Sequence, residues 1–241
     1  MSLSPVTSDT EVNVSRVFQA LSIILFFATV SVGEATSPSE DTNKSRLLIE
    51  QSLVRSGFIG TTSVEFSEVS REGELEGCSL VYKAVFPDVV YRSGQPTIAV
   101  GNITFNNIGN KFIGLSFKIG LRPLVDKTTA PFEPPNFAYI ITSNGSSAKM
   151  KQVANELDDG FKFFAYPLDD PAFAGLFEGL ISDEEITIAF NRAEKSVDQR
   201  FKLDLAVDDS EMKDGKIVRA RTKKSLSKFI ECSGVLIDRE S

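Results

Sequence analysis

The sequence predicts a mainly β protein, a single-domain antiparallel β-sandwich or barrel-like fold with two or three short helices. Most segments after Gly60 alternate apolar and polar residues with the period of two that half-buried strands show. Turn-forming residues separate these segments at short intervals, and the helical segments that parallel crossovers need are mostly missing. The hydrophobic content of 41% and the charged content of 24% are those of an ordinary globular chain.

The N-terminal residues 1–35 predict a signal peptide. Residues 17–32 form an apolar run that is shorter than the about 20 residues of a membrane-spanning helix. Small residues follow this run, and cleavage after Ala35 places Gly33 and Ala35 at the two small-residue positions. Arg16 is the only cationic side chain in this region, so an uncleaved membrane anchor and a buried core helix remain alternatives. Export with cleavage predicts a periplasmic or extracellular protein without a membrane span.

The rest of the chain divides into a lead-in and one domain. Residues 36–60 begin with a polar stretch and continue with a short helix, in which the apolar residues of 46–55 cluster on one face. Residues 61–241 form the β-rich domain, because the apolar period changes from helical to two after Gly60. A domain of this length buries roughly 70% of the surface of its unfolded chain.

The clearest strand covers residues 111–121. Its apolar residues at every second position, from Ile113 to Leu121, fall on one face, and small or polar residues fall on the other. Residues 199–207 and 185–190 show the same alternation and are expected to form two further strands. Weaker strands are expected at residues 63–69, 78–86, 97–105, 137–142, 161–168 and 216–222.

Two segments predict helices, and a third is ambiguous. Residues 169–180 start with two aspartates before Pro171, which favours a helix cap and a first helical position there, and apolar residues follow at helical spacing. Residues 225–232 predict a short last helix. Residues 148–157 fit a helix or a strand, and we expect a strand because residues 158–160 have the composition of a tight hairpin.

Cys78 and Cys232 are the only cysteines, and they lie far outside the spacing of redox or metal motifs. In an exported protein, two cysteines most simply form one disulfide. Such a bridge ties an early strand to the C-terminal segment and stabilises the fold by about 5 kcal/mol in the chain-entropy model. Two buried free thiols are the alternative.

Composition excludes several classes of function. The chain contains no histidine, so Ser-His-Asp and Cys-His nucleophiles and His-ligated zinc are excluded. The net charge of −7 argues against a nucleic-acid partner, because clustered Lys and Arg drive phosphate binding. Calcium-loop, P-loop and dinucleotide-binding motifs do not occur. We therefore expect a protein without catalytic residues, metal or cofactor.

The most uneven charge lies between residues 213 and 228, where cations outnumber the single acid Asp214. Arg219 and Arg221 share one face of an expected strand, Lys223 continues this face and Lys224 follows it. We interpret these four residues, Arg219, Arg221, Lys223 and Lys224, as a patch for an anionic partner such as lipid headgroups, a polysaccharide or an acidic protein. A solvated strand face, or an edge strand protected by its charge, is the alternative.

Paired acids and two Ser-x-x-Lys motifs are the remaining candidates for chemistry. Acidic residues gather at 158–159, 169–170, 183–185 and 208–211. Two carboxylates are able to hydrolyse a glycosidic bond, but solvated turns and helix caps also explain these groups. Ser225–Lys228 and Ser146–Lys149 have the spacing of Ser-Lys acyl enzymes, whose companion motifs are absent.

The layout from Cys78 onward resembles that of invasion-associated locus B proteins, which are small exported bacterial proteins. The similar stretches are GCSLVYKAV, LSFKIGLRPL, FAGLFEGLISDEEITIAF and FKLDLAV. The resemblance covers about 130 residues, rests on the order of the elements, and implies a β-sandwich-like domain, export and interaction at the cell envelope without catalytic residues.

The sequence thus favours an exported, non-enzymatic β-sandwich protein that acts as an envelope-associated binding or interaction module with an envelope component or protein partner. Two alternatives remain open. One is a carboxylate-dependent hydrolase acting on an oligosaccharide. The other is a membrane-anchored accessory subunit, which requires that residues 17–32 stay on the chain.

Overall fold

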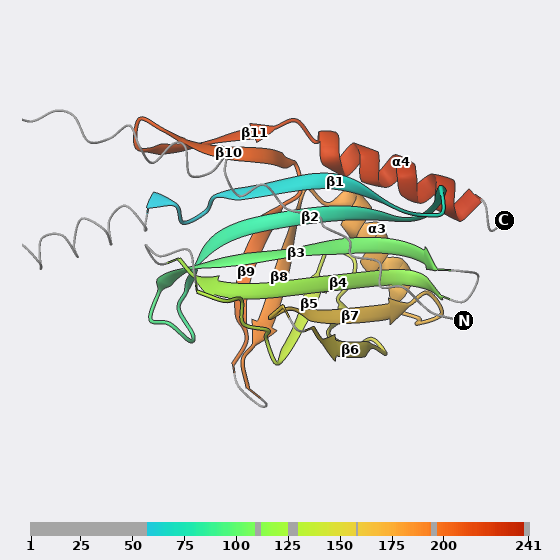
Figure 1. Cartoon of the computed structure of the whole chain (residues 1–241), viewed down its shortest axis with the longest axis horizontal. Helices are drawn as coiled ribbons and strands as arrows, with labels where there is room; N and C mark the ends of the chain where they lie inside the picture. The colour runs from blue at the N-terminus through green and yellow to red at the C-terminus, as the bar shows by residue number, and fades with distance from the viewer. Residues whose placement is uncertain (1–56, 109–111, 125–129, 158, 194–196, 239–241) are drawn as a thin grey trace, which may run out of the picture. The chain divides into compact units, whose positions relative to one another are not determined.

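The computed structural model describes residues 57–108, 112–124, 130–157, 159–193 and 197–238. Within these ranges the chain forms eleven strands, two α-helices and a short 3-10 helix, all belonging to one compact unit (Figure 1). The predicted signal peptide and the predicted helix at residues 46–55 lie outside the described residues.

Antiparallel pairing organises the strands into two sheets and a hairpin. The six-stranded sheet has the order β1 (Thr62–Arg71), β2 (Glu74–Asp88), β3 (Gln95–Ile108), β4 (Phe112–Pro123), β7 (Lys162–Pro167) and β6 (Val153–Glu156). The three-stranded sheet has the order β5 (Phe137–Ile141), β8 (Glu185–Asn191) and β9 (Gln199–Asp204). The hairpin pairs β10 (Val207–Lys213) with β11 (Lys216–Arg221). Strands make up 55% of the structure, so the predicted mainly β fold is confirmed.

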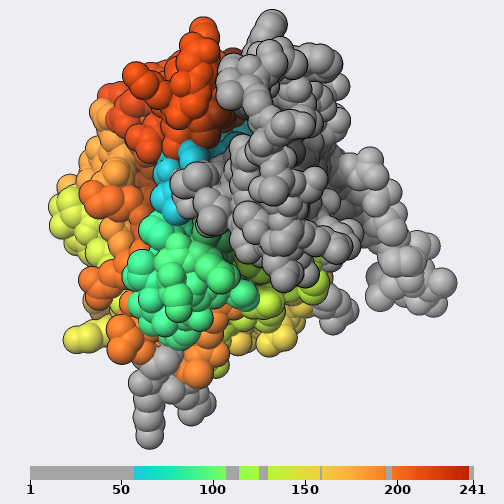
Figure 2. Space-filling model, turned by 90° about the vertical axis from the view of Figure 1, so that its left-hand side faces the viewer, coloured from blue at the N-terminus to red at the C-terminus, as the bar shows by residue number. Residues whose placement is uncertain are grey.

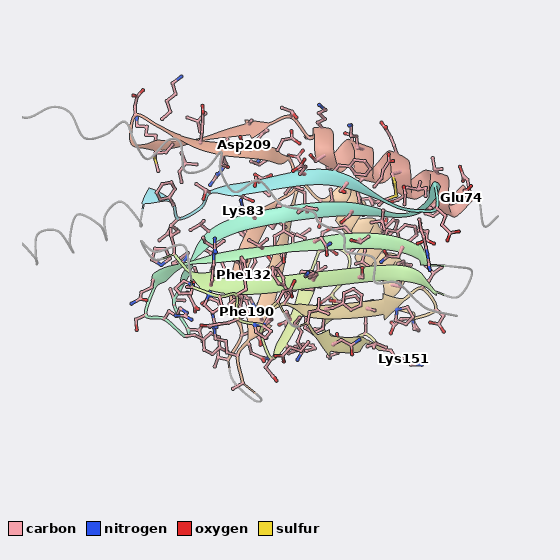
Figure 3. The ribbon with its side chains drawn as sticks, viewed as in Figure 1. Glu74, Lys83, Phe132, Lys151, Phe190 and Asp209 are labelled. Atoms are coloured by element: carbon pink, nitrogen blue, oxygen red, sulfur yellow. A yellow bond between two sulfur atoms is a disulfide. The ribbon has the colours of Figure 1, made fainter. Side chains whose placement is uncertain are left out.

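The core lies between the two sheets. Strand register places Leu80, Ile103, Phe117 and Phe164 side by side across four strands, and each of them is at most 1% exposed. The opposite layer contributes aromatic rings from β8 and β9, including Phe190, which lies behind the larger sheet in Figure 3. Aromatic contacts of this kind add to the stabilisation that burial alone provides. The two sheets form a sandwich, which is one of the two architectures predicted from the sequence, the other being barrel-like.

Alternation determines which residues of the clearest strand enter this core. Leu115, Phe117, Ile119 and Leu121 of β4 are completely buried, whereas Lys118 between them is half-buried on the other face. The prediction is confirmed from Leu115 to Leu121, because successive side chains point to opposite faces of a sheet, while residue 111 and the side chain of Ile113 lie outside what the structure describes.

Two helices pack against the same core. Helix α3 (Phe173–Ser182) buries Leu176 and Leu180 and places Phe177 at 4.9 Å from the ring centre of Phe105 on β3. Helix α4 (Lys224–Asp238) covers β1 and β2 at the rim of the larger sheet (Figure 1). None of the helices that the structure describes combines the length and hydropathy needed to cross a bilayer.

A disulfide joins Cys78 on β2 to Cys232 on α4, which confirms the predicted pairing. Both residues are buried, and the bridge spans 154 positions of the chain. The disulfide therefore fixes the face of α4 that is turned towards the sheet.

The hairpin β10–β11 and helix α4 lie along the free edge of β1 (Figure 1). Ser210 of β10 accepts a hydrogen bond from the Thr62 amide at 3.2 Å and donates one to the Thr62 carbonyl. Farther along the strand, the Lys228 ammonium lies 5.9 Å from the centre of the Phe66 ring. The hydrogen bonds of Ser210 satisfy the edge backbone groups of Thr62, which would otherwise be unpaired.

The structure differs from the sequence expectations near the C-terminus. The strand expected at residues 199–207 ends at Asp204, because the Asp204 carboxylate accepts a hydrogen bond from the Ala206 amide and turns the chain into β10. The last helix extends to Asp238, beyond the expected end at residue 232. The ambiguous residues 148–157 contain the 3-10 helix η2 (Ser147–Lys149) and then the short strand β6, so the preference for a strand is borne out for Val153–Glu156.

Candidate functional site

The structure brings the four predicted patch residues together on one continuous stretch of chain. Arg219 and Arg221 belong to β11, Lys223 follows the strand and Lys224 opens α4. All four are exposed, and the hairpin β10–β11, coloured orange-red, lies at the upper left in Figure 2. The backbone of Lys223 is left-handed, with φ of 58°, which turns the chain from the strand into the helix.

Glu184, directly before β8, forms the centre of the ion pairs in this patch. Its two carboxylate oxygens accept from Arg221 Nη2, at 2.7 Å, and from Lys223 Nζ. Arg221 reaches a second carboxylate, that of Asp204, through its Nη1 atom. Hydrogen bonds and charge from Lys223, followed by Arg221, hold the pKa of Glu184 below its usual value.

The rest of the patch is held by neighbouring backbone and cap groups. Arg219 donates to the Gly60 carbonyl at 2.7 Å, which attaches β11 to the residues before β1. Asp208 caps α4, because its carboxylate accepts from the Ser225 amide at 3.0 Å and from the Thr222 hydroxyl. Burial works to raise the pKa of Asp208, but these hydrogen bonds outweigh it and leave the pKa below its ordinary value.

A shallow pocket of about 440 Å³ adjoins the patch, and Glu184 is part of its wall. Hydroxyl and carboxylate groups predominate in this wall, which suits a polar ligand better than an apolar one. The lining residues are Ile141, Thr142, Ser143, Ser182, Asp183, Glu184, Glu185 and Thr187.

Close packing of α3 on the turn after β5 builds one side of the pocket. Gly179 of α3 faces the hydroxyl of Thr142 so closely that a Cβ atom at this position would overlap it. Asp183, which follows the helix, accepts from the amide and the hydroxyl of Ser143, both at 2.7 Å. The helix and the turn are therefore fixed relative to each other by steric fit and by a paired hydrogen bond.

The carboxylates of the pocket are engaged within the protein. Asp183 binds Ser143, Glu184 binds Arg221 and Lys223, and Glu185 accepts from Lys202 at 2.5 Å. Within the described ranges, no group of three or more acids or cysteines is arranged to hold a metal ion. The arrangement is suited to binding through hydrogen bonds and charge.

The two Ser-x-x-Lys motifs do not bring a serine to a lysine. Ser147 is fully buried and its hydroxyl accepts from the Ile140 amide, while Ser146 caps the 3-10 helix through a bond from the Ala148 amide. Ser225 lies in the first turn of α4, whereas Lys228 extends over the Phe66 ring. Ser146 and Ser225, the serines of the two motifs, therefore make structural contacts and are not paired with a catalytic base.

The other acidic groups occupy turns and caps. Asp159 forms an ion pair of 3.1 Å with Lys118, and Asp170 accepts from the amides of Lys151 and Ala172 before α3. Asp158 lies outside the described residues. These placements agree with the interpretation of the acids as turn residues. The expected cap at Asp169–Pro171 is not formed, because α3 begins at Phe173 with Ala172 as its N-cap and has no side-chain cap hydrogen bond.

A cluster of ion pairs beside the buried Asp88, at the end of the sandwich, has no counterpart in the sequence analysis. Asp88 ends β2, Arg92 lies in the turn that follows and Arg192 follows β8. Both arginines donate to Glu133, at 2.8 and 2.5 Å, although Glu133 is far from each in the sequence. Only the folded chain brings these residues together, so spacing along the sequence offered no signal for them.

No family model matches the chain, and no match was found among curated proteins or among solved structures. The function is therefore inferred from the geometry of the structure.

Proposed function

We propose that this protein is an exported, non-enzymatic β-sandwich that binds an anionic component of the cell envelope through the patch Arg219, Arg221, Lys223 and Lys224. The observation that carries the proposal is the local excess of positive charge on a chain that is acidic as a whole. In the described ion pairs, two of these four cations, Arg221 and Lys223, meet two carboxylates, those of Glu184 and Asp204. A cationic surface of this kind attracts anionic headgroups or polysaccharides over a distance set by salt.

The disulfide supports export. A bond between Cys78 and Cys232 persists in oxidising compartments and is rare in the cytosol. The resemblance to invasion-associated locus B proteins, which the β-sandwich and the element order motivate, points to the same envelope location. Mass spectrometry of the native N-terminus tests the export mechanism, since a chain starting at Thr36 supports cleavage and a membrane-bound intact chain supports the anchored alternative.

Binding to vesicles and to a soluble polysaccharide tests the patch. Vesicles containing phosphatidylglycerol are compared with pure phosphatidylcholine vesicles, and a soluble acidic polysaccharide forms the second arm. The charge-reversed variant Arg219→Glu/Arg221→Glu/Lys223→Glu is expected to lose about 100-fold in affinity for the anionic target, since each cation near an anionic surface contributes about 1 kcal/mol. Binding of the native chain should weaken as salt is raised.

A matched control carries the same change of net charge elsewhere. Arg71, Lys149 and Lys151 are exposed, none of them belongs to β11 or α4, and Lys151 lies far from both elements in Figure 3. The variant Arg71→Glu/Lys149→Glu/Lys151→Glu should bind like the native chain. Equal losses in both triple variants, or no binding of the native chain to either target, would refute the proposed patch.

One observation favours the alternative of a hydrolase acting on oligosaccharides: the carboxylates of Asp183, Glu184 and Glu185 all line the pocket. Their hydrogen bonds and ion pairs within the protein argue against a free acid and base. Cleavage of an oligosaccharide by the native chain, abolished in Asp183→Asn or Glu185→Gln, would establish this activity instead.

A further inference from the structure

The rotation of α4 about its axis is fixed by its buried side. Leu226, Phe229, Cys232 and Leu236 are buried against the sheets, and Cys232 is joined covalently to β2. The opposite side of the helix consequently faces solvent along the rim of the molecule (Figure 1).

A regular row of small and apolar residues runs along the solvent side of α4. Ser227, Ile230, Gly234 and Ile237 follow one another at intervals of three, four and three residues, which is the spacing of a coiled-coil seam. Ile230 and Ile237 are 37% and 45% exposed, and Ser227 is exposed as well. A Cβ atom built on Gly234 would meet nothing within 4 Å. We call these four residues the α4 seam.

Charged residues flank the α4 seam on one side. Lys224, Glu231 and Asp238 are spaced seven residues apart, so they form a second row parallel to the seam. If two copies of the helix paired in parallel about a twofold axis, the charged rows would lie on opposite sides of the paired seams and would not contact each other. In an antiparallel pair, Lys224 of each copy faces Asp238 of the other, and only Glu231 meets its own copy.

We propose that the α4 seam is the interface of a homodimer in which two copies of this chain pair their α4 helices antiparallel about a twofold axis. The partner is a second copy because the charge row is complementary to itself in this orientation, as an isologous interface requires. The small side chains of Ser227 and Gly234 let the helix axes approach, and the isoleucines fill the space between them.

The size of the interface sets the strength of the dimer. A helix of 15 residues is about 22 Å long, so the contact is small by the standard of stable interfaces. The dimer is therefore expected to be weak, and dilution should yield monomers.

Sedimentation of the exported, disulfide-bonded chain over a range of concentrations tests the proposal. The mass of the native chain should rise from that of one copy to that of two as concentration increases. Ile230→Asp places a charge in the seam and should leave a monomer at every concentration. Val235→Asp is the matched control, because Val235 is 47% exposed on the same helix but lies off the seam.

Charge exchange tests the orientation of the helices. Lys224→Asp and Asp238→Lys should each weaken the dimer by about tenfold, and the double variant should regain the native affinity. Glu231→Gln should strengthen the dimer, since it removes the one like-charge contact. A native chain that stays monomeric throughout, a dimer that survives Ile230→Asp, or a double variant no tighter than the single variants would overturn the proposal.

The variants distinguish failure of the proposed dimer from failure of the proposed binding function. Ile230→Asp leaves Arg219, Arg221 and Lys223 unchanged, so its monomer should still bind anionic vesicles at high protein concentration. The triple variant Arg219→Glu/Arg221→Glu/Lys223→Glu retains the seam and should still dimerise.

Discussion

The carboxylate of Asp88 lies 3.7 Å from the guanidinium of Arg192, and the Asp88 side chain is completely buried. One Asp88 oxygen also accepts from the Tyr91 amide at 2.9 Å, within the turn between β2 and β3. Arg192 extends the contact to Glu133. The pair thus joins a turn of the larger sheet to the end of a strand in the smaller one.

Removing one partner of this pair should be costly. Asp88→Ala removes the acceptor of the Tyr91 amide and the buried carboxylate beside Arg192, which keeps its contact with Glu133, and we expect the free energy of unfolding to fall by about 1 to 3 kcal/mol. Urea denaturation followed by circular dichroism measures this loss. Glu133→Ala is the control, because Glu133 is 47% exposed and its ion pairs are expected to contribute about 1 kcal/mol or less. Equal losses in both variants would contradict the importance of the buried pair.

Loss of the disulfide should destabilise the fold without changing its sheets. In the chain-entropy model, a bridge spanning 154 positions stabilises the native state by about 5 kcal/mol. Denaturation of Cys78→Ser/Cys232→Ser, compared with the oxidised native chain, measures the difference. The native chain treated with a reductant serves as a second comparison. Unchanged stability in the double variant would show that the bridge does not constrain the unfolded chain.

Two glycines of the helices should respond oppositely to alanine. Gly179→Ala places a methyl group against the Thr142 hydroxyl, and we expect a loss of about 1 to 3 kcal/mol from the resulting overlap. Gly234→Ala meets open space and should stabilise α4 by up to about 1 kcal/mol through helix propensity. Thermal unfolding at low protein concentration tests both variants. A stable Gly179→Ala chain would mean that α3 shifts easily from the turn it contacts.

Stability should depend on pH mainly below the range in which histidine titrates, because the chain contains none. Lys223 and Arg221 lower the pKa of Glu184 in the folded chain below its usual value of 4.5. The folded state therefore binds fewer protons, so the contribution of Glu184 is complete above this value and is lost as the pH falls through the lowered pKa. Denaturation between about pH 7 and 3 should show a smaller acid-induced loss for Glu184→Gln than for the native chain.

A control acid separates this local effect from general acid denaturation. Glu178→Gln changes an exposed carboxylate on α3 and should retain the pH dependence of the native chain. If Glu184→Gln and Glu178→Gln behave alike, the ion pairs of Glu184 do not couple its protonation to folding.

Strands could be predicted where apolar, buried residues alternate with polar, exposed ones along the sequence. In β4, alternation identified the inward residues from Leu115 to Leu121, because one face of the strand contacts the core along its length. In β10, the segment from Val207 to Lys213 is too acidic to show such alternation, and its strand conformation depends on pairing with β11. The pairing is tertiary information that no local pattern contains.

The candidate site was predictable in part. The clustering of Arg221 and Lys223 follows from their proximity in the sequence. Their shared contact with Glu184 does not, because β8 is separated from β11 by β9 and β10 along the chain. The cysteine pairing was accessible for a different reason: with two cysteines, only one intramolecular disulfide is possible.

The contacts of Ser210 with both backbone groups of Thr62 hinder another chain from pairing with the edge of β1 at this position. An uncovered edge strand is a template on which another chain can add and nucleate a fibril. At the start of β1, that template is accessible only after the hairpin β10–β11 has separated from Thr62. A chain in which the hairpin has come away from β1 should therefore associate through its first strand while its core is still folded.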